Sequence, residues 1–201
     1  MAAKLTLDDI ADQRAYERER DAFRTQVIAL KKRRRVHVGP VVTLVFENLD
    51  TIRFQIQEMA RAERMLSDEA IQGELDVYNP LIASAGELSA TLFIELTTEA
   101  ELREWLPKLV GIERSVQLIV GDGPDAEVIR AEPEQGHAAQ LTREEITASV
   151  HYIRWTLTPD QVERVAAGTV VLAVDHPSYP HRTLLGEETR AELVADLRGA
   201  G

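Results

Sequence analysis

The first half of the chain alternates between two hydrophobic patterns. Apolar residues recur at helical spacing in three segments, which predict helices over 7–32, 52–66 and 68–78. Between the first two segments, residues 36–47 are almost continuously apolar and predict one or two strands that bend at Gly39-Pro40. The first helix carries mostly charged side chains, so only a narrow stripe of it is expected to pack on the rest of the protein.

The second half has the period of two that is typical of half-buried strands, interrupted by helical segments. The predicted strands cover 89–96, 116–120, 126–131, 148–157 and 169–175, and the predicted helices cover 99–109, 159–167 and 187–197. Since regular β-α-β units are missing, we expect an α+β fold with a mostly antiparallel sheet covered by helices. The length of 201 residues fits a single such domain, with residues 1–35 as a helical N-terminal arm that docks on it.

Composition and charge exclude several classes of protein. The chain has no cysteine, which excludes disulfides and thiolate metal sites. Its formal net charge of −11 argues against nucleic acid as a partner, because nucleic-acid-binding domains are usually basic. The sequence does not open on a secretion signal, and no apolar run reaches the length of a membrane span. We therefore expect a cytoplasmic protein without a membrane partner.

Six segments spread over nearly the whole chain form a distinctive set. They are Leu5-Thr6-Leu7-Asp8-Asp9-Ile10, Phe46-Glu47-Asn48, Thr51–Met59, Glu74–Pro80, Ala90–Glu95 and Asp175-His176-Pro177-x-Tyr179. In these segments the sequence resembles a bacterial family called domain of unknown function 3501, which has no assigned activity or catalytic residues. The resemblance implies genes beside those of a rubrerythrin-like protein and an iron–sulfur oxidoreductase. It thereby implies an iron or oxidative-stress setting, with one of these two proteins as a partner.

Two glutamates fall on or near the apolar sides of their predicted helices. At about 100° per residue, Glu63 falls on the same side as Ile52 and Ile56, and Glu74 falls beside Val77. A carboxylate in such a place must be paired, metal-bound or protonated, because the burial of a free charge is costly. A salt bridge to a nearby arginine is the simpler interpretation, and a metal ligand is the alternative.

Three histidines in the second half complete a candidate metal site. His151 lies on the apolar face of its predicted strand, His176 continues the apolar face of the strand over 169–175, and His181 follows shortly after. If the two strands pair antiparallel, His151 and His176 lie close together. With Glu63 or Glu74 they would bind non-haem iron, manganese or zinc. The simpler interpretation of each histidine is an imidazole at the edge of the core that is hydrogen-bonded to the backbone.

A run of five basic residues ends the first predicted helix. It consists of Lys31, Lys32, Arg33, Arg34 and Arg35. The run would suit an acidic partner or a phosphate group. The alternative is internal, because positive charge is favourable at the C-terminus of a helix and the rest of the chain is strongly acidic.

Three hypotheses for the function follow from these patterns. The leading one is a cytoplasmic accessory protein in iron or oxidative-stress metabolism that acts through protein contacts and a bound metal; it rests mainly on the family resemblance. The second is a non-haem metalloenzyme that uses the histidine and glutamate set. The third is a pure interaction module that presents the N-terminal helix to a partner.

Overall fold

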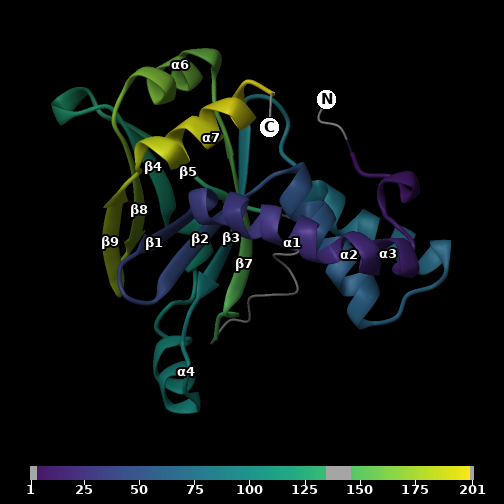
Figure 1. Ribbon diagram of the computed structural model, residues 1–201. Coiled ribbons are helices and arrows are strands. Elements are labelled where there is room, and N and C mark those ends of the chain that lie inside the picture. The colour runs from purple at the N-terminus through teal and green to yellow at the C-terminus, as the bar shows by residue number, and fades with distance from the viewer. Residues whose placement is uncertain (1–3, 135–145, 200–201) are drawn as a thin grey trace.

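The computed structural model describes residues 4–134 and 146–199, in which six α-helices and two antiparallel sheets form the expected α+β fold (Figure 1). The helices are α1 (Gln13–Arg34), α2 (Leu49–Ala62), α3 (Asp68–Tyr78), α4 (Glu99–Trp105), α6 (Pro159–Ala167) and α7 (Glu187–Leu197). The strands are β1 (Arg35–Val38), β2 (Val42–Glu47), β3 (Glu87–Ile94), β4 (Val116–Val120), β5 (Glu127–Arg130), β6 (Glu132–Pro133), β7 (Val150–Thr156), β8 (Val170–His176) and β9 (Tyr179–Leu184). None of the helices in the described part of the chain is long and apolar enough to span a membrane.

The two sheets are joined at both of their edges. One has the strand order β1-β2-β3-β7-β6 and the other β5-β4-β8-β9. At one edge β5 and β6 are separated by Ala131 alone, so a single extended segment passes from one sheet to the other. At the opposite edge the Tyr179 hydroxyl donates to the carbonyl oxygen of Val38 at 2.8 Å and accepts from the N–H groups of Val41 and Val42. These contacts satisfy backbone groups that a free sheet edge would expose.

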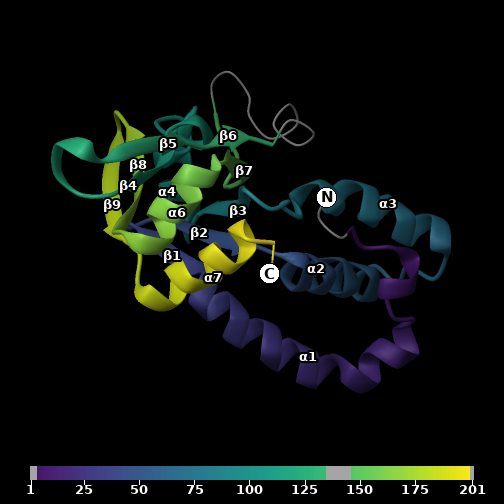
Figure 2. The same ribbon diagram turned by 90° about the horizontal axis from the view of Figure 1, so that it is seen from above.

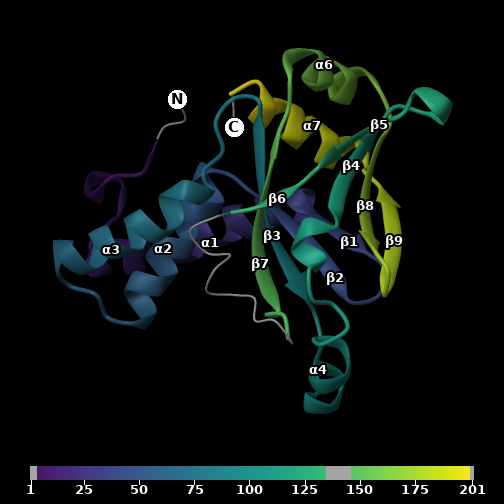
Figure 3. The same ribbon diagram turned by 180° about the vertical axis from the view of Figure 1, so that it is seen from behind.

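The main hydrophobic core lies between the sheets. The period of two along each strand turns residues such as Leu44, Phe46 and Trp155 inward, and the rings of Phe46 and Trp155 lie 5.6 Å apart. Helices α6 and α7 lie together at one end of the sheets, and α4 lies at the other end (Figures 1 and 3).

Helices α1, α2 and α3 extend to one side of the sheets and are together called the helical arm from here on (Figure 2). This name covers more of the chain than the N-terminal arm of residues 1–35 that the sequence predicts. The arm has a second, smaller core, formed by Leu5, Ile52, Ile56, Leu75, Leu81 and Ile82. Glu58 links α2 to α1, since its carboxylate accepts hydrogen bonds from Arg20 at 2.8 Å and from the Tyr16 hydroxyl at 2.7 Å. The Arg20 guanidinium holds the pKa of Glu58 down at about 2.

The first helix begins later than the sequence predicts. Thr6 and Asp9 do form a capping box, but it encloses only the 3-10 turn Leu7–Asp9, and the chain is extended again at Ile10. Helix α1 then starts with its own cap at Asp12, whose side chain accepts from two backbone N–H groups. The predicted start was therefore wrong, because a local capping signal closes one turn without specifying that a helix continues.

Two expectations about the strands were also wrong. The strand over 148–157 does not pair with the strand over 169–175, because β7 pairs with β3 and β6, whereas β8 pairs with β4 and β9. The second concerns residues 179–184, for which no strand is predicted although they form β9, which contains Pro180. Proline is tolerated there because β9 is an edge strand of its sheet, where a ladder donor is not required of every residue.

Candidate functional site

A cavity of about 210 Å³ lies between the helical arm and the outer face of the sheet. The strands β2, β3 and β7 form its floor with Glu47, Thr91, Phe93, Val150 and Tyr152. The arm and the turn Asn79–Leu81 form its walls with Lys31, Ile52, Gln55, Tyr78 and Leu81. Cavities with aromatic and apolar walls and a few polar groups are typical of small-molecule sites.

The strand alternation explains why polar groups line the floor. Residues Leu44 and Phe46 of β2 point into the core, so Glu47 points to the outer face, where the arm covers it. The Glu47 side chain is only 8% exposed. Its carboxylate accepts a hydrogen bond from the Thr91 hydroxyl at 2.6 Å, and it forms no ion pair with any residue that the structure describes.

Two tyrosines line the cavity beside this carboxylate. Tyr152 lies opposite Thr91 in the β3–β7 ladder and is hydrogen-bonded to Tyr78 of α3. Burial, followed by the proximity of Tyr78 and Glu47, raises the pKa of Tyr152 to about 12. The Tyr152 phenol therefore keeps its proton at physiological pH and remains able to donate a hydrogen bond.

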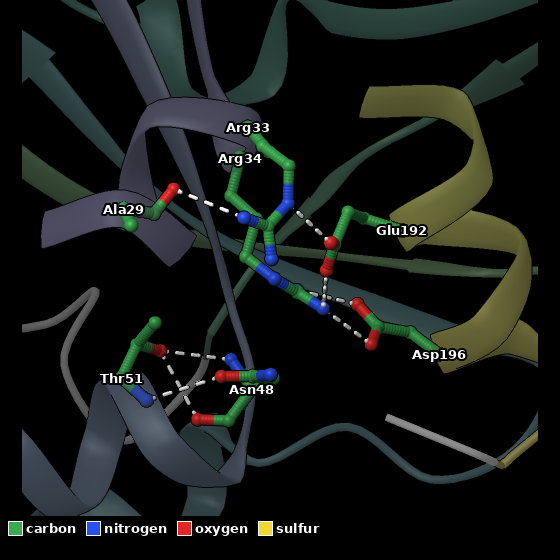
Figure 4. Close-up of polar contacts among 7 residues, drawn as sticks. All are labelled: Ala29, Arg33, Arg34, Asn48, Thr51, Glu192 and Asp196. Carbon is green, nitrogen blue, oxygen red and sulfur yellow. Dashed lines mark hydrogen bonds and ion pairs between the residues drawn. The ribbon is translucent and has the colours of Figure 1, made fainter. Parts of the chain in front are cut away.

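Lys31 and Gln55 supply the donors on the arm side of the cavity. Lys31 stands near the end of α1, and its ammonium lies 5.9 Å from the ring centre of Phe54. Helix α2, which carries Gln55, starts directly after Glu47, because Asn48 caps it in a reciprocal arrangement with Thr51 (Figure 4). A single turn of chain thus places an acidic strand end and a polar helix face around one cavity.

The other four residues of the basic run differ in how deeply they are buried. Arg34 is 1% exposed and makes two hydrogen bonds of 2.7 Å to Asp196 of α7, and Arg33 reaches Glu192 on the same helix at 2.7 Å (Figure 4). Arg33 and Arg34 thus dock on the acidic part of the chain, which is one of the two interpretations of the run. Lys32 and Arg35 are exposed, and their role in binding a partner remains a prediction.

The two glutamates proposed as metal ligands lie on the α2–α3 hairpin of the arm. Helix α2 ends at Ala62, and Arg64 has a left-handed φ of 53°, so the helical projection does not apply to Glu63, which is exposed. Glu74 is half-buried, and desolvation together with the nearby charge of Glu63 raises its pKa. The expectation that Glu63 lies on the apolar side of the helix was wrong, because the helix stops before it.

The histidines lie in the sheets and bond to backbone groups. His176 accepts from the Ser178 N–H through Nδ1 and donates from Nε2 to the carbonyl oxygen of Val110 at 3.1 Å, so both its nitrogens are used. Nε2 of His151 lies 2.9 Å from the Ala148 carbonyl oxygen. The ring of His181 packs at a tilt against that of Tyr179, with 4.3 Å between ring centres.

The structure does not bring these residues together. His151 and His176 belong to different sheets, because their strands do not pair. Within residues 4–134 and 146–199, no group of three or more histidine, aspartate or glutamate side chains is arranged to hold a metal ion. The simpler interpretation, an imidazole bonded to the backbone, describes His151 and His176.

One buried carboxylate in this region has no counterpart in the sequence analysis. Glu113 is 5% exposed, and its Oε2 atom has no hydrogen-bond partner in the part of the chain that the structure describes. Its charge favours the protonated form of His151, but burial has the larger effect and lowers the pKa of that imidazole. His151 is accordingly neutral at physiological pH.

Comparison with known proteins identifies the family. The family model described as a protein of unknown function, DUF3501, matches residues 4–197. The chain belongs to the DUF3501 family. A crystal structure described as a novel protein of unknown function from Burkholderia pseudomallei K96243 is 36% identical to this DUF3501 protein, with a TM-score of 0.88, over 97% of this chain and 100% of that one. No curated protein matches the chain.

Four of the six segments that carry the DUF3501 resemblance meet at the cavity. Glu47, Gln55, Tyr78, Thr91 and Phe93 line it, and each lies in one of the segments that resemble the family. None of these five residues was predicted as a site residue. Glu47, for example, resembles the polar end of an apolar strand. The usable signal was the family resemblance itself, which marked the segments without showing that they meet.

Proposed function

We propose that this DUF3501 protein is an accessory protein that binds a small polar molecule in the cavity between the arm and the sheet. The observation that carries the proposal is the Glu47 carboxylate, which is 8% exposed, lines the cavity and has no ionic partner in the described part of the chain. An unpaired charge in such a place is costly, and a ligand with a positive group would offset that cost.

A screen of small metabolites tests this proposal. Binding to the wild-type protein is measured by the shift in melting temperature and then by titration calorimetry. We expect at least one compound to bind, and Glu47→Gln to weaken its binding by roughly tenfold or more, because the substitution removes the charge and keeps the shape. Glu132→Gln, at an exposed position in the same sheet, is the matched control. Binding that is equal in the wild type and Glu47→Gln would refute the proposal, as would no binding at all.

The iron or oxidative-stress setting is part of the same proposal and rests on the family resemblance. The surface of the arm supports a role in protein contacts, since Ile28, Leu66 and Val77 are 52%, 80% and 44% exposed. Exposed apolar side chains mark a protein interface only where they form a patch, and the Leu66 variant tests whether these do. The test is calorimetric titration with the purified rubrerythrin-like protein and with the iron–sulfur oxidoreductase, comparing the wild type with Leu66→Asp. Lack of binding to both would remove this part of the proposal.

A non-haem metalloenzyme was the alternative from the sequence, with Glu63, Glu74, His151, His176 and His181 as ligands. The described geometry does not fit that ligand set, since the glutamates lie on the arm and the histidines in the two sheets. Elemental analysis of untagged protein tests it, because bound iron, manganese or zinc in stoichiometric amount would revive the hypothesis.

A further inference from the structure

The cavity carries one full charge of each sign, on two different parts of the molecule. Glu47 stands at the end of β2, and Lys31 stands on α1 in the arm. Neither side chain is in an ion pair with another residue of the described chain. We propose that the ligand is a small zwitterion with an ammonium group and a carboxylate, as in a free amino acid. This inference rests on the proposed function and names the class of ligand.

The Glu47 end suits an ammonium group. One carboxylate oxygen is held by the Thr91 hydroxyl at 2.6 Å, which fixes its orientation and leaves acceptor capacity on both oxygens. The rings of Tyr78, Phe93 and Tyr152 line the same cavity. Aromatic faces attract cations, so a carboxylate among aromatic rings favours an ammonium over a neutral group.

The Lys31 end suits a carboxylate. The Lys31 ammonium and the Gln55 amide both offer donors to an anion, and both belong to the arm that forms the wall opposite the sheet. A ligand that satisfied Glu47 alone would leave this second charge partly desolvated. A zwitterion neutralises both groups and leaves the net charge of the complex unchanged, so neither charged side chain is left without a partner.

The size and donor set of the cavity argue against two other occupants. Its volume of about 210 Å³ lies below the range of roughly 300–1,000 Å³ that is typical for drug-sized ligands, so the occupant is small. A divalent cation such as calcium requires about six to eight oxygen ligands, whereas this cavity offers one carboxylate and otherwise mainly aromatic, apolar and donor groups.

Three matched series of compounds test the inference on the wild-type protein. They are the standard free amino acids, their methyl esters, which keep the ammonium and lose the anionic group, and their N-acetyl derivatives, which keep the carboxylate and lose the cationic group. We expect at least one free amino acid to bind in calorimetry, and its two blocked forms to bind roughly tenfold more weakly or not at all. This comparison needs no variant, so it stands even if a substitution in the cavity impairs folding.

Two pairs of variants assign each end of the ligand. Glu47→Gln and Lys31→Met are each expected to weaken binding of the free amino acid by roughly tenfold. Glu47→Gln should matter little for the N-acetyl form, and Lys31→Met little for the ester, since each blocked compound lacks the group that the lost side chain binds. The matched controls are Glu132→Gln and Lys32→Met, at exposed positions, and they should leave every affinity unchanged.

The outcomes separate this inference from the proposed function. If a methyl ester binds as tightly as the free amino acid and Lys31→Met has no effect, the ligand is a simple amine and the zwitterion is refuted. If no free amino acid binds but another metabolite binds through Glu47, the zwitterion is again refuted and the small-molecule site stands. If nothing binds through Glu47, both fall together.

Discussion

At the residue scale, burial rather than charge decides the role of each member of the basic run. Arg34 is 1% exposed against Asp196 and Glu192, whereas the side chain of the adjacent Arg33 is 41% exposed. We expect Arg34→Met to lower the free energy of unfolding by about 3–5 kcal/mol, because it strands the carboxylate of Asp196, whose side chain is only 9% exposed. Arg33→Met should cost at most about 1 kcal/mol, since its ion pair is partly solvated.

Chemical denaturation of the two variants checks this difference. They form a matched pair, with the same residue type, the same substitution and neighbouring positions at the end of α1. The double variant Arg34→Met/Asp196→Asn should recover part of the loss, because it also removes the charge that Arg34→Met leaves stranded. Equal losses in the two single variants would show that the Arg34 pair is no more important than a surface ion pair.

A second prediction at this scale concerns the pH dependence of stability. Burial lowers the pKa of His151 in the folded protein, so between that value and the unfolded value of about 6.5 the unfolded chain binds the proton more readily. The contribution of His151 to stability is therefore complete above about pH 6.5 and is lost as the pH falls towards the folded pKa, by at most about 1.4 kcal/mol per pH unit. We expect His151→Gln to flatten the dependence between about pH 7 and 5.

Denaturation midpoints measured across this pH range test the His151 prediction. The exposed His37 provides the control, in the variant His37→Gln, for the loss of a histidine outside the core. A slope in His151→Gln as steep as in the wild type would mean that the buried imidazole does not set it.

At the scale of elements, the turn between β1 and β2 is fitted against β9. Gly39 has a φ of +71°, and a Cβ atom there would lie 2.6 Å from the Tyr179 hydroxyl oxygen and 2.5 Å from Cγ of His181. Tyr179 cannot easily move, because its hydroxyl bonds to three backbone groups of β1, β2 and the turn between them. We expect Gly39→Ala to destabilise the protein by about 1–3 kcal/mol more than backbone strain alone would.

Gly123→Ala is the matched control for that strain. Gly123 has a similar φ of +68°, but a Cβ atom there would meet no other atom within 4 Å. The loss in free energy of unfolding of Gly123→Ala should therefore equal the strain of a left-handed residue, about 1–2 kcal/mol. The additional loss in Gly39→Ala should equal the cost of the steric clash. Equal losses of stability in the two variants, measured by thermal or chemical denaturation, would show that β9 moves to accommodate the new methyl group.

At the scale of the whole molecule, the two cores differ greatly in size. The core of the arm is a small cluster around Ile52, Ile56 and Leu75, whereas the core between the sheets runs through every long strand. A region with few buried apolar contacts opens at lower free energy than the rest. We therefore expect the amides of α2 and α3 to exchange with solvent faster than those of β3, β4 and β8.

Two leucine-to-alanine variants separate the cores. Leu75 and Leu118 are 0% and 1% exposed, one in each core. Leu75→Ala should speed exchange in the arm and leave β4 and β8 nearly unchanged, whereas Leu118→Ala should lower the global free energy of unfolding by about 2–5 kcal/mol and speed exchange everywhere. Uniform effects of Leu75→Ala across the molecule would show that the arm and the sheets unfold as one cooperative unit.

The local pattern of the sequence was enough to predict most elements and the class of the fold. The strands β3, β7 and β8 and the helices α2, α3, α6 and α7 occur near their predicted positions, because residues on one face of an element share one environment and repeat at its period. Errors occurred where a local signal was extended too far. Glu63 was projected beyond the end of α2, and the cap at Thr6 was given a whole helix instead of one turn.

The tertiary structure alone decided which elements meet. Periodicity tells which face of β7 is buried but not that β3 is its neighbour, so the proximity of His151 and His176 could not be settled from the sequence. For the same reason the cavity could not be predicted, since Lys31, Glu47, Tyr78 and Tyr152 belong to four different elements whose packing no local pattern specifies. The family resemblance marked segments of the wall and floor one by one. Only the packing of the arm on the sheet made them a single site, because burial and charge compensation depend on neighbours that no local pattern specifies.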